Sequence, residues 1–354
     1  MIGPLKRLFA RKQPVQAPVP IGDTTLFNVY STLVELERPT FPHLLHARRD
    51  LSDPELLAHL NRFCGHILDL GDGQMSADKY HVILHVQRVQ HHLSMAVGLG
   101  DLDAFHAWAR RANAILFTQD EQVTDPAGRA LLGAADPAAL LPYPEQAWAR
   151  KAASEAALAA RGIQVQESLP PLVSETELVL RERDEVVGRA RALLLVALRA
   201  ESVASNEPMS VGTLLDKMPL AEDYLSPDEK AFLAQDKPAQ KECAPFLWRY
   251  ESLTVLEWAL GLTGDLPFPA APCDAAKTVA TLIAMRGPTL RAGSEILDAL
   301  DLSYRLHWHI RQQRLKKRPD TQGLDADVVM ERHHALNWLV RFQHAGWDKV
   351  DTPT

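Results

Sequence analysis

From Pro142 onward, the sequence is divided by residues that start and stop α-helices. Ser226 to Glu229 reads Ser-Pro-Asp-Glu, a capping box with proline at the first helical position. Ser174 and Glu177 have the same capping-box spacing, which predicts a helix that begins there and ends near Val203. These signals favour a chain whose second half is built from helices.

Further helices are predicted by apolar periodicity and by proline and glycine. Pro245 is expected to start a helix that Gly261 stops, since proline suits a first helical turn and glycine a helix end. The remaining periodic segments are 274–285, 294–316 and 326–344. Residues 142–354 are therefore predicted to form a predominantly helical domain.

The chain before this domain has a more mixed pattern. Residues 24–35 are rich in Thr, Val, Phe and Tyr and predict a strand. Asp53-Pro54 is expected to open a helix that continues to about Leu70. Residues 76–97 fit either a helix that Ser76 caps or, toward their end, a strand, so both interpretations stay open.

The segments that follow complete a small unit. Residues 101–113 predict a helix, and 115–118 with the Asp-Pro-Ala-Gly-Arg stretch at 125–129 predict strand, turn and strand. The sequence thus indicates an α+β protein: a small N-terminal mixed α/β unit at 21–135, followed by the predominantly α-helical domain. Residues 1–20, which contain four prolines, are expected to be a flexible tail.

Composition excludes several classes of protein. The 354 residues carry a net charge of −7 with acids and bases interspersed, so no basic surface for nucleic acid is expected. The longest apolar run is far too short to span a membrane. Three cysteines lie far apart and outside any CxxC spacing, which favours free thiols in a reducing compartment, and hence a cytoplasmic protein.

Polar residues inside apolar stripes are the candidates for a site. On a helical projection of 246–260, Arg249 and Glu251 lie on apolar flanks, so each is expected to need a partner from another helix. A narrow solvent-facing side is left for three residues of this helix. They are Tyr250, Thr254 and Glu257.

Two more helices bring charges inward beside a tryptophan. In 294–316, Asp301 and Arg305 have the i, i+4 spacing of a helical ion pair. In 326–344, Glu331 and His334 lie on the same helix face as the apolar residues Trp338 and Phe342. The predicted buried polar cluster or pocket comprises Trp248, Arg249, Glu251, Asp301, Tyr304, Arg305, Trp308, Glu331, His334 and Trp338. Such a set is either a network that fixes helix docking or a ligand pocket.

No catalytic or cofactor signature accompanies these residues. Glu331 and His334 have Glu-x-x-His spacing, but a carboxylate-bridged di-metal bundle needs that motif twice, and no second copy is found among these helices. The sequence has no GxGxxG, P-loop or GxSxG motif. We therefore expect no metal and no cofactor, and catalytic residues cannot be assigned.

Several ordered motifs resemble the family catalogued as domain of unknown function 4272. They are Trp248-Arg249-Tyr250-Glu251, Trp258-Ala259-Leu260-Gly261, Ile296-Leu297-Asp298, Asp301-Leu302, Tyr304-Arg305, Trp308, Glu331-Arg332-His333, Ala335-Leu336, Trp338-Leu339, Trp347-Asp348 and Asp351-Thr352. The stretch at 125–129, followed by Pro142-Tyr143-Pro144, resembles longer members, so the likeness extends over about 125–352. It implies a bacterial cytosolic protein and supplies no activity.

The sequence leaves two hypotheses for the function. The first is a non-catalytic binding or interaction protein, a regulator or a toxin-immunity protein, whose partner is another protein. The alternative is an enzyme or small-anion-binding protein with a polar pocket between the C-terminal helices, in which an arginine would hold an anion and a carboxylate would act as a base.

Overall fold

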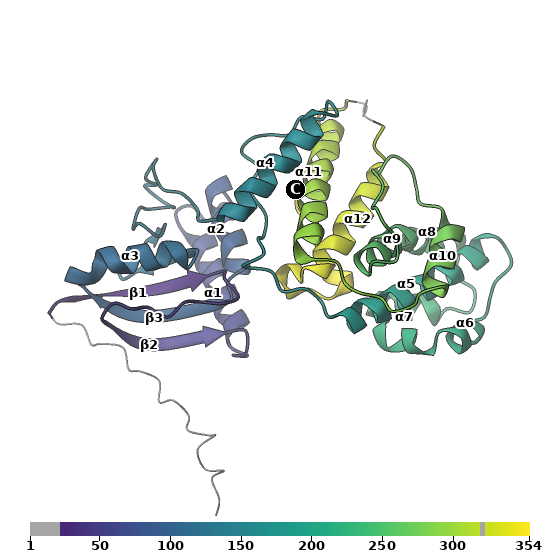
Figure 1. Cartoon of the computed structure of the whole chain (residues 1–354), viewed down its shortest axis with the longest axis horizontal. Coiled ribbons are helices and arrows are strands. Elements are labelled where there is room, and N and C mark those ends of the chain that lie inside the picture. The colour runs from purple at the N-terminus through teal and green to yellow at the C-terminus, as the bar shows by residue number, and fades with distance from the viewer. Residues whose placement is uncertain (1–21, 319–322) are drawn as a thin grey trace, which may run out of the picture. The chain divides into compact units, whose positions relative to one another are not determined.

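The chain folds into two compact units, residues 1–143 and 144–354. A computed structural model describes residues 22–318 and 323–354 (Figure 1). The tail expected at 1–20 lies outside these described residues. Each unit is described by itself below.

A five-stranded antiparallel sheet with the order β2-β3-β1-β4-β5 forms the first unit. Its strands are β1 (Thr24–Ser31), β2 (His43–Asp50), β3 (His91–Gly98), β4 (Ala114–Thr118) and β5 (Val123–Thr124). The predicted α+β class is confirmed. Strand β2 was not predicted, because this edge strand, with the sequence HLLHARRD, lacks the alternation of a half-buried strand.

Helices cover both faces of this sheet. Helix α3 (Leu102–Arg111) lies along one face of the sheet (Figure 1). Its Phe105 and Trp108 pack with Val29 and Met95 of that face. Helices α1 (Leu56–Asp69) and α2 (Ala77–Gln87) pack on the opposite face around Tyr30. The ambiguous segment 76–97 contains both elements, since Ser76 caps α2 and β3 follows it.

The Asp125–Arg129 stretch is a loop, which corrects the predicted second strand. The buried Asp125 carboxylate accepts backbone N–H bonds from Ala127 at 2.8 Å, Arg129 at 3.0 Å and Leu140 at 3.2 Å. These bonds satisfy the amides locally, so the chain turns instead of extending the sheet.

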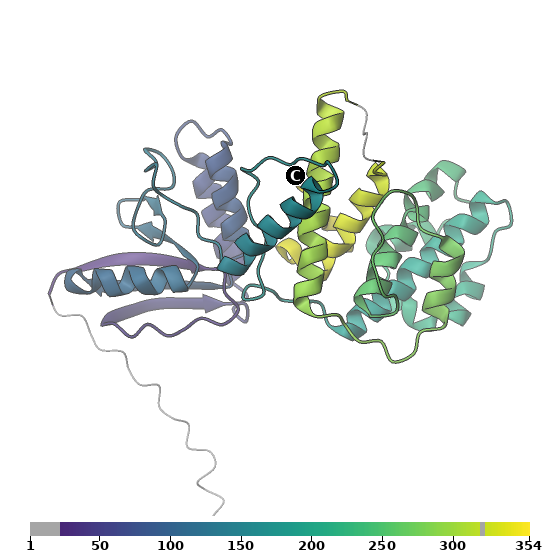
Figure 2. The ribbon, with the colours of Figure 1, turned by 45° about the horizontal axis from the view of Figure 1, so that its top comes forward.

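The second unit is helical, as predicted. Its helices are α4 (Glu145–Ala159), α5 (Arg183–Ala204), α6 (Val211–Lys217), α7 (Pro227–Leu233), α8 (Gln240–Leu247), α9 (Arg249–Ala259), α10 (Ala275–Ile283), α11 (Gly293–Leu315) and α12 (Ala326–Leu339), with short 3-10 turns at η3 (Pro219–Tyr224), η4 (Phe342–His344) and η5 (Trp347–Lys349). Helix α5 packs against α8, α9 and η3, and α11 lies between α4 and α12 (Figure 2). In the described ranges, no helix has the length and apolarity needed to cross a bilayer.

Two predicted helix starts in this unit are wrong. The Glu177 carboxylate does accept the Ser174 N–H at 2.9 Å, but the helix begins nine residues later at Arg183. Residues 175–177 form only a turn, and the irregular chain that follows packs Leu178 and Leu180 against the helical core. Pro245 lies inside α8 and does not start a helix, and the chain breaks at Trp248 before α9.

The predicted solvent-facing side of α9 is also wrong. Helix α10 covers Glu257, and the Tyr250 hydroxyl donates to Glu201 of α5 at 2.5 Å, so both residues are buried. The Thr254 hydroxyl lies 3.3 Å from that of Thr278 on α10. A projection of one helix cannot show that a later helix will cover its polar side.

Candidate functional site

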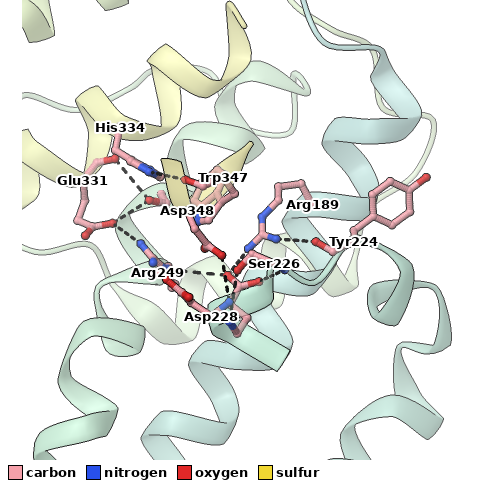
Figure 3. Close-up of polar contacts among 11 residues, drawn as sticks. Arg189, Tyr224, Ser226, Asp228, Arg249, Glu331, His334, Trp347 and Asp348 are labelled. Atoms are coloured by element: carbon pink, nitrogen blue, oxygen red, sulfur yellow. Dashed lines mark hydrogen bonds and ion pairs between the residues drawn. The ribbon is translucent and has the colours of Figure 1, made fainter. Parts of the chain in front are cut away.

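Charged side chains from five elements surround Trp347 in the helical unit (Figure 3). They come from α5, α7, α9, α12 and η5, so the site needs most of the helical core in place. We call this set the Trp347 cluster: Arg189, Glu229, Arg249, Glu331, His334, Trp347 and Asp348.

Arg189 and Glu229 form its most deeply buried ion pair. Their side chains are 3% and 0% exposed, and Nη2 of Arg189 donates to Oε1 of Glu229. The other Glu229 oxygen accepts the Ser226 N–H at 3.0 Å, as the predicted capping box of α7 requires. Burial lowers the pKa of the Arg189 guanidinium, and the adjacent Glu229 charge opposes that shift.

Arg249 and Glu331 form a second ion pair in the cluster. Nη1 of Arg249 lies 3.3 Å from Oε2 of Glu331, and the Ser252 hydroxyl donates to that same oxygen at 3.0 Å. Burial raises the pKa of the Glu331 carboxyl, while the Arg249 charge opposes the shift. The predicted partner of Arg249 from another helix is therefore Glu331.

His334 is fixed in one tautomer by Trp347. Its Nε2 lies 3.0 Å from the Trp347 carbonyl oxygen, which can only accept, so Nε2 carries the proton and Nδ1 does not. Burial, helped by the Arg249 charge, lowers the pKa of His334 to about 4. The imidazole is consequently neutral at physiological pH and its Nδ1 is an acceptor.

Five buried polar atoms of the Trp347 cluster have no hydrogen-bond partner among the described residues. The donors are Nε of Arg189, Nε of Arg249 and Nε1 of Trp347, and the acceptors are Nδ1 of His334 and Oδ1 of Asp348. The other Asp348 oxygen accepts the Asp228 N–H at 3.0 Å. With two guanidiniums against three carboxylates, the cluster carries a net negative charge.

Asp301 and Arg305 lie in a separate cluster on α11. Arg305 is fully buried and bidentate, with Nε–Oδ2 at 2.8 Å and Nη2–Oδ1 at 3.0 Å, and it also reaches Glu155 of α4 at 3.1 Å. The predicted i, i+4 ion pair is present. The Tyr304 ring lies on the same helix, edge-on to His333.

Glu251 lies in a third place, between α9 and α12. Its Oε2 accepts from Nε of Arg332 at 3.1 Å, and its Oε1 accepts the Cys273 N–H. Arg332 also donates to the Pro267 carbonyl at 2.5 Å. Glu251 therefore holds the 267–273 loop against the two helices and does not join Arg249.

The ten predicted site residues are thus divided among several places. Arg249, Glu331 and His334 meet in the Trp347 cluster, and the Trp338 ring packs on Trp347 at a centroid distance of 5.3 Å. Trp248 and Trp308 are only partly buried and belong to none of the three charged groups described above. Sequence reasoning missed four members of the cluster. They are Arg189, Glu229, Trp347 and Asp348.

The order of these helices and their motifs is matched by a known family model. The model of the domain of unknown function 4272 (DUF4272) matches residues 150–350, which is more than half of the chain. The chain belongs to the DUF4272 family. No curated protein and no solved structure matches the chain.

The DUF4272 domain also has an open groove of about 530 Å³ beside α11. Leu302 and Leu306 of α11 line it, together with Phe268 of the loop after α9 and Val329 of α12. It lies over a small satellite core that includes Leu158, Leu306 and Val329. The groove therefore marks where this part of the DUF4272 core is incompletely covered.

Four of the charged residues that line the groove are already engaged, namely Arg332, Asp298, Arg291 and Glu295. Arg332 is held by Glu251 and Pro267 as described, and Nε of Arg150 donates to Oδ1 of Asp298 at 2.7 Å. Arg291 donates to the carbonyls of Trp258, Thr263 and Gly264 and to Glu295. An arriving ligand would therefore meet mainly apolar surface, with charges only at the rim.

Across residues 22–318 and 323–354, no group of three or more His, Cys, Asp or Glu side chains is placed to hold a metal ion. Glu331 and His334 do share a face of α12, but they bond to different partners, Arg249 and the Trp347 carbonyl.

Proposed function

We propose that this chain is a non-catalytic binding protein whose DUF4272 domain receives a segment of a partner protein in the groove beside α11. The observation that carries the proposal is the commitment of Arg332, Asp298 and Arg291 to partners within the domain. A site for small molecules usually offers a few converging polar groups that orient the ligand. This groove offers apolar side chains, which suits the side chains of another protein.

The buried charges support the same role. Arg305 with Glu155, Arg332 with Glu251 and Arg189 with Glu229 each join two helices of the core. Ion pairs of this kind specify how helices dock. The partner would be a protein under regulation or a toxin that this chain neutralises, and we place the interaction in a bacterial cytoplasm. Three unpaired cysteines support a reducing compartment.

A photo-crosslinking amino acid at Ser303, which lines the groove, tests the proposal in the native host. The matched control carries it at Lys241, an exposed residue of α8 outside the groove. We expect a protein adduct from position 303 only, joined through an apolar segment that mass spectrometry identifies, and its loss when Leu302→Glu is added. The same adducts from both positions, or none from position 303, would contradict the proposal.

A second candidate is a small-ligand or enzymatic site at the Trp347 cluster, which the five unpaired buried atoms favour. The net negative charge of the cluster disfavours an anion and favours a neutral molecule that both accepts and donates hydrogen bonds. Melting temperatures measured with urea, a neutral molecule, and with acetate, an anion, at equal ionic strength distinguish these two kinds of ligand. A stabilisation by urea at low concentration, absent from Trp347→Phe, would support this candidate; no ligand-specific shift would remove it.

A further inference from the structure

A group of imidazole and guanidinium side chains lies on the sheet of the first unit, beside α1. Tyr30, His92 and Arg49 form a row across β1, β3 and β2, because Tyr30 pairs with His92 and His92 pairs with Arg49 in the strand register. Residues paired across neighbouring strands have their side chains on the same face of a sheet. His59 of α1 covers this row, with its ring centroid 4.1 Å from that of His92. The four side chains therefore form one contiguous group.

His92 is the buried base of this group. It is 2% exposed, and its Nδ1 lies 3.2 Å from Nη1 of Arg49, which can only donate. The Nδ1 atom is therefore unprotonated, and Nε2 donates to Oδ1 of Asn28 at 3.2 Å. Because both nitrogens of His92 are engaged, this ring fixes the position of the Arg49 guanidinium and leaves the other N–H groups of Arg49 free.

The positive charges beside His59 have no carboxylate partner among the described residues. Arg49 is half-buried and bonds to the neutral His92, and Arg62, which follows His59 by one turn of α1, is exposed. Burial lowers the pKa of His59 most, and the charges of Arg49 and Arg62 lower it further. The nearby Cys64 thiol supplies no negative charge, because burial raises its pKa to about 11. An anion is therefore the missing counter-charge of this surface.

His59 can add a further donor when an anion arrives. Its ring is half-buried, and its Nε2 lies 3.2 Å from the Tyr30 hydroxyl. Burial raises the pKa of Tyr30, so this hydroxyl keeps its proton and adds no charge. A protonated His59 donates from both nitrogens, through Nε2 to the Tyr30 oxygen and through Nδ1 to a ligand. An anion beside Arg49 would offset the two guanidinium charges and so stabilise this protonated form.

We propose that Arg49, His59 and Arg62 bind a phosphate group, and that His59 takes up a proton as the phosphate binds. Two guanidiniums and one imidazolium match a phosphate dianion, whose oxygens accept several charge-assisted hydrogen bonds at once. Inorganic phosphate and a small phosphate ester both present this oxyanion. The site lies in the first unit and goes beyond the function proposed for the groove of the DUF4272 domain, so neither experiment decides the other.

The pKa of His59 in the full chain, read by histidine NMR and assigned with His59→Gln, tests the proposal. Sulfate is the probe, because it stays a dianion over the whole pH range in which histidine titrates. Compared with chloride at equal ionic strength, saturating sulfate should raise the pKa of His59 by about 1. Arg49→Gln and Arg62→Gln should each remove most of this rise. Arg62 is exposed, so its variant remains folded even if replacement of Arg49 disturbs the sheet.

Arg48→Gln is the matched control, because it removes the same charge from the adjacent residue of β2, whose side chain lies on the opposite face of the sheet. It should keep the full sulfate effect. No rise, a rise that does not saturate, or the same rise in chloride or in all three variants would overturn the proposal. Titrations with inorganic phosphate and with glycerol 3-phosphate then distinguish the two sources of the group by their relative affinities.

Discussion

Arg189 stacks over the ring of Trp347, with its guanidinium carbon 4.5 Å from the ring centroid. The same guanidinium is paired with Glu229, so a single side chain joins α5, α7 and η5. An aromatic face and a carboxylate together are a better environment for a buried arginine than either alone. The stability of the helical unit should therefore depend strongly on this one contact set.

Glu229→Ala should lower the free energy of unfolding by about 3 to 5 kcal/mol, because it leaves the Arg189 charge buried without its counter-ion. The neighbouring Asp228→Ala removes an exposed acid from the same helix turn and should cost at most about 1 kcal/mol. Denaturant titration followed by tryptophan fluorescence measures both, since six of the seven tryptophans lie in residues 144–354. Equal losses for the two variants would show that the ion pair is not the cause.

Glu257→Gln should change how stability depends on pH. Burial raises the pKa of the Glu257 carboxyl from 4.5 to about 8, so the folded state holds this proton more tightly than the unfolded state. The wild-type chain should therefore lose stability as pH rises from about 4.5 to about 8, and the glutamine variant should lose less over that window. Parallel pH profiles of the unfolding free energy would contradict the burial of this carboxyl.

His334→Gln should change how stability depends on pH on the acidic side of the profile. The pKa of His334 falls from 6.5 to about 4 on folding, so the unfolded chain takes up a proton first as the pH decreases. The wild type should lose stability between about pH 6.5 and pH 4, and the variant should lose less there. Histidine NMR titration reads the pKa of this imidazole directly. A value near 6.5 would mean that the ring is not buried against Trp347.

Gly188→Ala should destabilise the helical unit even though alanine favours helices. A methyl group at this position of α5 would overlap the Tyr224 ring, so the ring or the helix must move, at a cost of about 1 to 3 kcal/mol. Gly212→Ala in α6 is the matched control, because the nearest atom is 3.9 Å away on Ser210. It should be neutral or stabilising by up to about 1 kcal/mol. Melting temperatures of the two variants should move in different directions.

Local signals predicted the fold class and several helix ends, but not the partners of the buried charges. The capping box at Ser226 can be predicted because its two residues, Ser226 and Glu229, lie within one helical turn. The pairing of Glu229 with Arg189 joins residues 40 positions apart, which no local pattern encodes. For the same reason, the predicted polar cluster includes both Arg249 and Glu251. In the structure Arg249 pairs with Glu331 and Glu251 pairs with Arg332, in different parts of the core.

The errors also have identifiable causes. Ser174 and Glu177 have the residues of a capping box, yet the apolar side chains that follow gain more by packing on the core than by continuing a helix. The helical projection of 246–260 leaves Glu257 on the solvent-facing side, but α10 covers that side in the folded chain. In each case the deciding contact came from a segment distant in sequence.

Because the two oxygens of Glu229 serve different helices, substitutions around it cannot be accepted independently during evolution. Replacement of Arg189 by an apolar residue leaves the carboxylate needed for the Ser226 cap but without its charge partner, while replacement of Glu229 first leaves the arginine stranded. Whichever substitution comes first, the single variant is less stable than the starting protein. The two positions should therefore show strong epistasis and change together across the family, whereas the exposed Asp228 should be free to vary.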